Sequence, residues 1–333
     1  MDNDSYDFIM ALPSEPEERA WLQARLETLT VKESLILSAA LMKTPAQNGG
    51  DAIRVFMSLP DYAVCCSAGS YEQLGRFSLC HEMKLPEQIP NFIDMEQLGK
   101  NYEDEHSGLF IGNCYVEYPN QEPTICYDGT NLTACADNDW SVKLKLASEK
   151  RPKGVWLKLP DYSDANDGKP DEIRIALDEL GVKTVDECTL LDAKCVLPGI
   201  ENPAEPYNRI SDLIYDGQNL GFVLDERGQG MGNFMELYGA ALEYENCTRL
   251  DAALDIAEQL SRYEYVPMDG LREYAEQDLQ NQGVTLPETI SRVFDYEKYA
   301  ANLLEQQGFS LNRNKTAYVN KDPSQCFKGM TIE

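Results

Sequence analysis

The sequence has few of the side chains on which most catalytic sites depend. Only two of its 333 residues are histidines, His81 and His106. Neither histidine stands at the spacing of a zinc site, and no G-x-S-x-G motif or phosphate-binding glycine motif occurs. We therefore expect that the protein is not an enzyme and that it has no catalytic residues, no bound metal and no cofactor.

Basic residues are also scarce. There are 29 lysines and arginines against 57 aspartates and glutamates, so the formal net charge is −28. A protein that binds nucleic acid directly needs a basic surface, and an anionic membrane would repel this chain. Because 43% of the residues are hydrophobic, the chain can build ordinary cores and is not an acidic disordered tail. The composition indicates a folded acidic protein that binds neither nucleic acid nor membranes directly.

Long apolar runs and cysteine motifs are missing as well. Residues 1–22 lack the basic region and apolar run of a signal peptide, and no apolar stretch is long enough to span a bilayer. The ten cysteines are scattered and form no C-x-x-C motif. We therefore expect reduced, mostly buried thiols and a cytoplasmic location.

Two segments resemble sites but are interpreted as loops. Residues 228–234, GQGMGNF, lack the preceding strand and the Lys-Ser/Thr pair of a phosphate-binding loop, so we expect a loop between helices. Residues 161–172, DYSDANDGKPDE, carry acids at a spacing that differs from that of a calcium-binding loop. We expect a solvated acidic turn before a helix there.

The order of the patterns predicts an α+β chain of several domains. Residues 1–150 are expected to form an N-terminal α+β extension, in which helices over 14–60 precede short β-rich pieces such as YAVCC, GRFSLC and GLFIGNCYVEY. Residues 151–205 predict a small strand–helix–strand module. Residues 206–333 are expected to be acidic and nearly all helical, and to end in a hairpin.

Capping residues predict where the first helices begin. Ser14 with Glu17, and Thr30 with Glu33, have the spacing of capping boxes. In such a box each side chain accepts a hydrogen bond from the other residue's backbone N–H group. We therefore expect one helix to begin after Ser14 and another after Thr30.

The segment FDYEKYAANLLEQQGF, residues 294–309, predicts one further helix in detail. Asp295 is the expected N-cap, and Gly308 stands where the helix should stop. The apolar residues recur every three or four positions, which predicts a single buried stripe. This stripe consists of Tyr296, Tyr299, Ala300, Leu303 and Leu304.

Most of the negative charge lies in the second half of the chain. Residues 161–310 contain 31 acidic and 11 basic residues, a net charge of −20, whereas the rest of the chain has a net charge of −8. Like charges at spacings of three or four residues cost a helix roughly a few tenths of a kcal/mol per pair. Such a face is either merely solvated or kept for a partner. The candidate partner-binding carboxylates are Asp251, Asp255, Glu258, Glu264, Asp269, Glu273, Glu276, Asp278, Glu288, Asp295, Glu297 and Glu305.

Residues 152–320 resemble the ArdA antirestriction family. The resemblance is carried, in order, by GVWLKLP, EIRIALDELGV, ECTLLDAKC, YEYVPMDGLREYAEQDL and FDYEKYAANLLEQQGF, followed by a hairpin with AYV. Members of this family are acidic, elongated, typically dimeric proteins of mobile genetic elements. They occupy the DNA-binding groove of type I restriction–modification enzymes.

The resemblance implies an elongated antirestriction protein that mimics DNA, acts as a homodimer and binds a restriction–modification or other DNA-binding defence enzyme. The twelve carboxylates would then replace phosphates opposite arginine and lysine side chains. A dimer would carry twice the charge of −28, which matches about 28 base pairs of duplex DNA. The alternative is an acidic adaptor or regulatory protein of a conjugative element that binds another basic protein. Competition by duplex DNA distinguishes the two.

Overall fold

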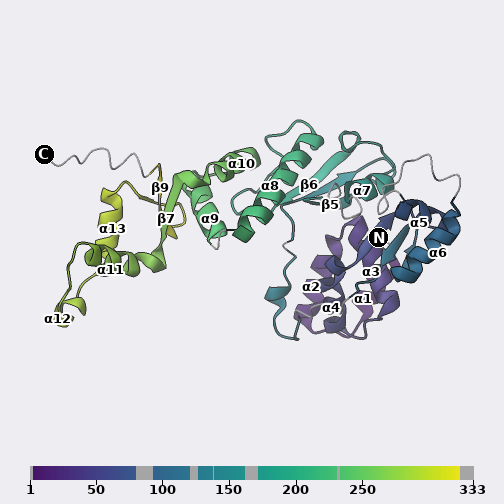
Figure 1. Ribbon diagram of the computed structural model, residues 1–333, viewed down its shortest axis with the longest axis horizontal. Coiled ribbons are helices and arrows are strands. Elements are labelled where there is room, and N and C mark those ends of the chain that lie inside the picture. Colours follow the sequence, from purple (N-terminus) through teal and green to yellow (C-terminus); the bar gives the residue numbers. More distant parts are fainter. Residues whose placement is uncertain are drawn as a thin grey trace. The chain divides into compact units, whose positions relative to one another are not determined.

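The computed structural model describes residues 3–79, 93–120, 127–137, 139–161, 172–230 and 233–322. Its helices are accompanied by three small sheets of three strands each (Figure 1), which confirms the predicted α+β class. The chain divides into two compact units, unit 1 (Met1–Ala193) and unit 2 (Lys194–Glu333). The predicted boundary near residue 150 lies inside unit 1, between two strands that pair with each other.

Unit 1 opens with four helices around an apolar core. The capping box of Thr30 and Glu33 is confirmed, since the Thr30 hydroxyl accepts from the Glu33 N–H (3.1 Å) and Glu33 accepts from the Thr30 N–H (3.0 Å). The other box is displaced by one residue: Glu18 accepts from the Glu15 N–H, whereas Ser14 donates to the Leu12 carbonyl. The helices are α1 (Asn3–Ala11), α2 (Pro16–Glu27), α3 (Val31–Lys43) and α4 (Gly49–Met57).

The middle of unit 1 combines a sheet with two helices. The piece GRFSLC was predicted as β-rich, but its described part belongs to a helix that Ser70 caps by accepting from the Gln73 N–H. This helix lies against the next one where Gly75 meets Gly99. A Cβ at Gly75 would come within 2.0 Å of the Met95 carbonyl oxygen, so the two helices can approach this closely only because the residue is glycine. The elements are β1 (Ala63–Cys66), α5 (Tyr71–Phe77), α6 (Met95–Glu105), β2 (Gly108–Ile111) and β3 (Cys114–Glu117), with sheet order β1-β3-β2.

The end of unit 1 is joined to its first helices by buried charges. Lys158 donates to Glu33 (2.5 Å) and to Asp137 (2.7 Å), and Arg25 also pairs with Glu33 (2.5 Å). These ion pairs tie the sheet β5-β4-β6 to α2 and α3. The elements are β4 (Val142–Ala147), β5 (Val155–Leu159), α7 (Glu172–Leu180) and β6 (Thr189–Cys195), and β4 pairs antiparallel with β5.

Unit 2 is mainly helical, as predicted, but it also holds one strand that was not predicted. Residues 263–267 form β7, which pairs antiparallel with β9 from Tyr263↔Lys321 to Pro267↔Ala317 and so extends the predicted hairpin to three strands. The elements are α8 (Ile210–Gly230), α9 (Phe234–Tyr244), α10 (Leu250–Glu258), β7 (Tyr263–Pro267), α11 (Leu271–Asn281), α12 (Glu288–Ser291), α13 (Tyr296–Gln306), β8 (Ser310–Leu311) and β9 (Ala317–Lys321).

The two segments that were interpreted as loops have different outcomes. The described part of the first is largely helical, and the second lies largely outside the described residues. In the segment 228–234, the first three residues continue α8 and Phe234 begins α9. In the segment 161–172, only the two ends are described: Asp161 accepts from the Ile173 N–H (3.0 Å), and Glu172 begins α7.

Helix α13 confirms its predicted boundaries. The Asp295 carboxylate accepts from the Lys298 N–H (2.9 Å), and Gly308 adopts a left-handed φ of +85° just after the helix. The buried stripe is narrower than predicted: Tyr296, Ala300 and Leu304 are buried, while the predicted members Tyr299 and Leu303 are half-buried. This stripe packs on α11 (Figure 1) in a core with Leu271, Ala275, Leu279, Phe309 and Tyr318.

Candidate functional site

Ten of the twelve predicted carboxylates have exposed side chains, and only Asp251 and Asp278 are half-buried. The apolar stripes of their helices explain this arrangement, because the acidic residues occupy the positions between the buried ones. On α11, for example, Leu271, Ala275 and Leu279 are buried, so Glu273 and Glu276 face solvent. The exposed carboxylates lie on α10, α11, α12, α13, β7 and the turns beside them.

Three of the twelve carboxylates have a basic neighbour within the protein. Asp251 forms a two-pronged ion pair with Arg249 (2.7 and 3.1 Å), and this pair lowers the pKa of Asp251. Glu276 pairs with Arg272 at 3.5 Å, and Glu288 with Arg292. The other nine have no lysine or arginine within 4.0 Å among the residues that the structure describes. They are Asp255, Glu258, Glu264, Asp269, Glu273, Asp278, Asp295, Glu297 and Glu305.

Asp278 differs from the exposed position predicted for it. Its carboxylate accepts from the Tyr299 hydroxyl (2.6 Å) and from the Gln282 amide (2.7 Å), which joins α11 to α13. The hydrogen bond to Asp278 raises the pKa of Tyr299, so this hydroxyl stays protonated and keeps donating at neutral pH. Asp278 is therefore a fixed carboxylate, and its replacement would also loosen the contact between the two helices.

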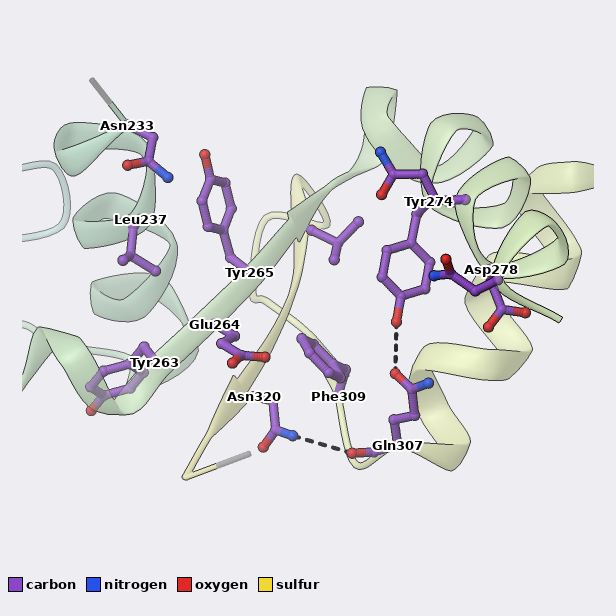
Figure 2. A pocket seen from close by; sticks show the side chains of 13 residues that line it. Asn233, Leu237, Tyr263, Glu264, Tyr265, Tyr274, Asp278, Gln307, Phe309 and Asn320 are labelled. Atoms are coloured by element: carbon purple, nitrogen blue, oxygen red, sulfur yellow. Dashed lines mark hydrogen bonds between the residues drawn. The ribbon is translucent and has the colours of Figure 1, made fainter. Parts of the chain in front are cut away.

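A cavity of about 670 Å³ lies beside β7 in unit 2 (Figure 2). Its lining comes from α9, β7, α11, β9 and the residues that end α13, and it includes two of the nine carboxylates, Glu264 and Asp278. Tyr274 donates to the Gln307 side chain (2.7 Å) across one wall, and Asn320 donates to the Gln307 carbonyl (3.2 Å). This cavity could not be predicted from local sequence patterns, since its lining residues are spread from position 233 to position 320.

Among the described residues, no group of three or more histidine, cysteine, aspartate or glutamate side chains could hold a metal ion. His106 stacks on the ring of Tyr102 (4.5 Å between centroids) at the end of α6, and its Nδ1 atom lies 3.7 Å from the Glu117 carboxylate. His81 lies outside the residues that the structure describes. The helices described here include none that is both long and apolar enough to cross a membrane.

Comparison of the chain with models of known protein families, with curated proteins and with solved structures finds no match. The resemblance of residues 152–320 to the ArdA family therefore stays a prediction.

Proposed function

We propose that the protein is an antirestriction DNA mimic that binds a restriction–modification enzyme of type I character and blocks its DNA-binding groove. One observation carries this proposal: nine carboxylates of unit 2 have no basic neighbour within 4.0 Å among the described residues, and eight of the nine are exposed. Exposed ion pairs contribute only about 0–1 kcal/mol to stability, so the fold loses little by leaving these charges unpaired. No lysine or arginine of the described residues neutralises these nine, so they can still attract the basic side chains of a partner, although Glu273, Asp278 and Asp295 also accept hydrogen bonds within the protein.

The chemistry of a carboxylate suits this role. An ionised carboxylate only accepts hydrogen bonds, as a phosphate does, and arginine binds both groups through two parallel N–H donors. The exposed acids of α11 and α13 rest on a shared apolar core and on the Tyr299–Asp278 hydrogen bond. Their positions are therefore set by packed helices, which reduces the ordering that binding must impose.

The proposal is tested by reversing charge on this surface. We choose Glu273→Lys, Glu297→Lys and Glu305→Lys together, because all three side chains are exposed and lie on the packed pair α11 and α13. The variant should keep its thermal unfolding temperature and weaken inhibition of a type I methyltransferase at least tenfold. Restriction protection in cells should fall in parallel.

A matched control makes the same change in net charge on unit 1. Glu17→Lys, Asp104→Lys and Glu105→Lys also replace three exposed acids. This control should inhibit as the wild-type chain does. If both triple variants lost inhibition equally, net charge and not this surface would be responsible. If neither did, α11 and α13 would not belong to the binding surface.

A further inference from the structure

Two cysteines of unit 1 lie directly opposite each other on neighbouring strands. The register of β1 and β3 pairs Cys66 with Cys114. Just beyond them, the Ala68 N–H donates to the Asn113 carbonyl (3.0 Å) and keeps the strands together. Residues directly opposite in an antiparallel pair share a face of the sheet, with Cα atoms roughly 4.5–5.5 Å apart. A disulfide spans about 4.4–6.8 Å between Cα atoms, so the backbone already has the spacing that a disulfide needs.

The two thiols already interact. Both are free cysteines, and the hydrogen bond between them lowers the pKa of Cys114 and raises that of Cys66. At Cys114, burial opposes the lowering of the pKa, whereas the Ser67 N–H and the charge of Arg174 support it. The charge of Asp178 acts in the same direction as burial. Cys114 is therefore the thiol that ionises first, and Cys66 keeps its proton.

A cation of α7 lies beside the pair. Arg174 acts on Cys66 through its charge and a hydrogen bond, and on Cys114 through its charge. Its Nε atom is buried and has no hydrogen-bond partner among the described residues. A buried donor without an acceptor is costly, and a thiolate supplies negative charge at this point. A neighbouring cation is typical of reactive cysteines and is not required around inert buried ones.

We infer that Cys66 and Cys114 form a redox-active dithiol that reacts with small hydroperoxides and closes a reversible disulfide between β1 and β3. Cys114 is the attacking thiol, Cys66 resolves the product, and Arg174 stabilises the Cys114 thiolate. Cys66 is 5% exposed and Cys114 is 9% exposed, so a peroxide of low mass suits the site, whereas a bulky disulfide oxidant does not. This inference is independent of the proposed function.

The reaction balances with hydrogen peroxide as the oxidant. The Cys114 thiolate attacks one peroxide oxygen, so an S–O bond forms, the O–O bond breaks, and hydroxide leaves as water after taking a proton. Cys114 is then a sulfenic acid. The Cys66 sulfur attacks this sulfenic acid, the S–S bond forms, the S–O bond breaks, and a second water leaves with the Cys66 proton. Two thiols are oxidised to one disulfide, and one peroxide is reduced to two waters.

Peptide mapping of the full chain tests the site without any substitution. The reduced protein is treated with hydrogen peroxide, the remaining thiols are alkylated, and the chain is digested without reductant. Mass spectrometry should find the peptides of Cys66 and Cys114 joined, and dithiothreitol should separate them. Joining of either residue to a different cysteine, or oxidation elsewhere while this pair stays reduced, would overturn the proposal.

Variants of single cysteines assign the order of the two steps. Cys66→Ala should stop the reaction at the sulfenic acid of Cys114, which dimedone traps, whereas Cys114→Ala should give no sulfenic acid on Cys66. Cys135→Ala is the matched control, because Cys135 is buried in the same core and its loss should leave the cross-link unchanged. Dimedone labelling of Cys66 in Cys114→Ala, at the rate seen for Cys114, would contradict the assigned order.

The role of Arg174 is read from the pH dependence of dimedone trapping. Arg174→Gln should slow trapping about threefold near neutral pH, because a lower thiolate fraction is partly offset by higher nucleophilicity. This loss should not persist once the pH is high enough to ionise the thiol in both proteins. Arg174→Lys keeps the charge and should keep the wild-type profile. An identical pH profile for Arg174→Gln and the wild type would contradict the assignment of Arg174.

Discussion

At the scale of single residues, Glu33 shows how one acidic side chain serves several purposes in unit 1. It closes the capping box of α3 and forms ion pairs with Arg25 and Lys158 in a buried position. Burial opposes its charged form, but the charges of Arg25 and Lys158 outweigh burial and hold the pKa of Glu33 below its ordinary value. The capping box could be predicted from the sequence, whereas the partner at position 158 could not.

Glu172 is a second buried carboxylate, and its pKa is raised, whereas the pKa of Glu33 is lowered. It accepts from the Thr30 hydroxyl (2.9 Å), and burial raises its pKa from 4.5 to about 7, although the charges of Lys32 and Lys158 oppose the rise. The negative charge of the nearby Glu33 adds to the rise in the pKa of Glu172. The folded chain therefore binds this proton more tightly than the unfolded chain does between pH 4.5 and 7.

This shift predicts how stability depends on pH. The contribution of Glu172 is fully present below pH 4.5 and is lost as the pH rises through about 7. Glu172→Gln imitates the protonated carboxyl, so its stability should equal that of the wild type near pH 4.5 and exceed it by about 3 kcal/mol at pH 8. Urea unfolding of both proteins from pH 4.5 to 8 measures this. A constant difference across that range would contradict the account.

At the scale of elements, two adjacent leucines of α13 differ in burial and should differ in their contribution to stability. Leu304 is fully buried, whereas the adjacent Leu303 is half-buried. Leu304→Ala should cost about 2–5 kcal/mol, because it leaves a cavity between α11 and α13. Leu303→Ala should cost less than half as much. Denaturant unfolding of the two variants decides this, and equal losses would show that the stripe is wider than the structure has it.

The contact of α5 with α6 predicts an unusual sensitivity to one methyl group. A Cβ at Gly99 would lie 1.9 Å from the Tyr71 carbonyl oxygen, so Gly99→Ala should separate the helices and cost about 2 kcal/mol. Gly239, inside α9, has nothing within 4 Å of such a Cβ. Gly239→Ala should therefore stabilise the protein by about 1 kcal/mol. Thermal unfolding of both variants checks the pair, and a neutral Gly99→Ala would refute the close approach.

The same elements show what sequence patterns could predict. Local signals placed the cap at Asp295, the stop at Gly308 and the box at Thr30, because each depends on residues only a few positions away. Helix α5 was missed although its cap is local, since Ser70 accepts from the Gln73 N–H, whereas strand β7 was missed because it depends on pairing with β9. The β9 partner of β7 is about fifty residues away and is not visible in the local sequence.

The candidate site also has features that could be predicted from the sequence and features that could not. The exposure of most of the predicted carboxylates could be predicted, because helical spacing separates them from the buried stripe. The half-buried position of Asp278 could not, because it depends on the Tyr299 hydroxyl of another helix. The cavity beside β7 was beyond prediction for the same reason, since five separate segments supply its lining.

At the scale of the whole molecule, the central quantity is the net charge of −28 and its concentration in residues 161–310. Attraction between exposed charges is screened over about 8 Å at physiological ionic strength. Binding to a basic groove should therefore weaken steeply as salt is added. An acidic adaptor would share this salt dependence, so salt alone does not separate the two functions.

Competition with DNA does separate them. The most direct measurement is the affinity of the chain for a type I methyltransferase core at increasing concentrations of duplex DNA that carries the enzyme's site. The account predicts that the apparent dissociation constant rises in proportion to the DNA concentration, without a ternary complex. An affinity that stays constant at saturating DNA, or a stable complex of enzyme, DNA and this chain, would contradict it.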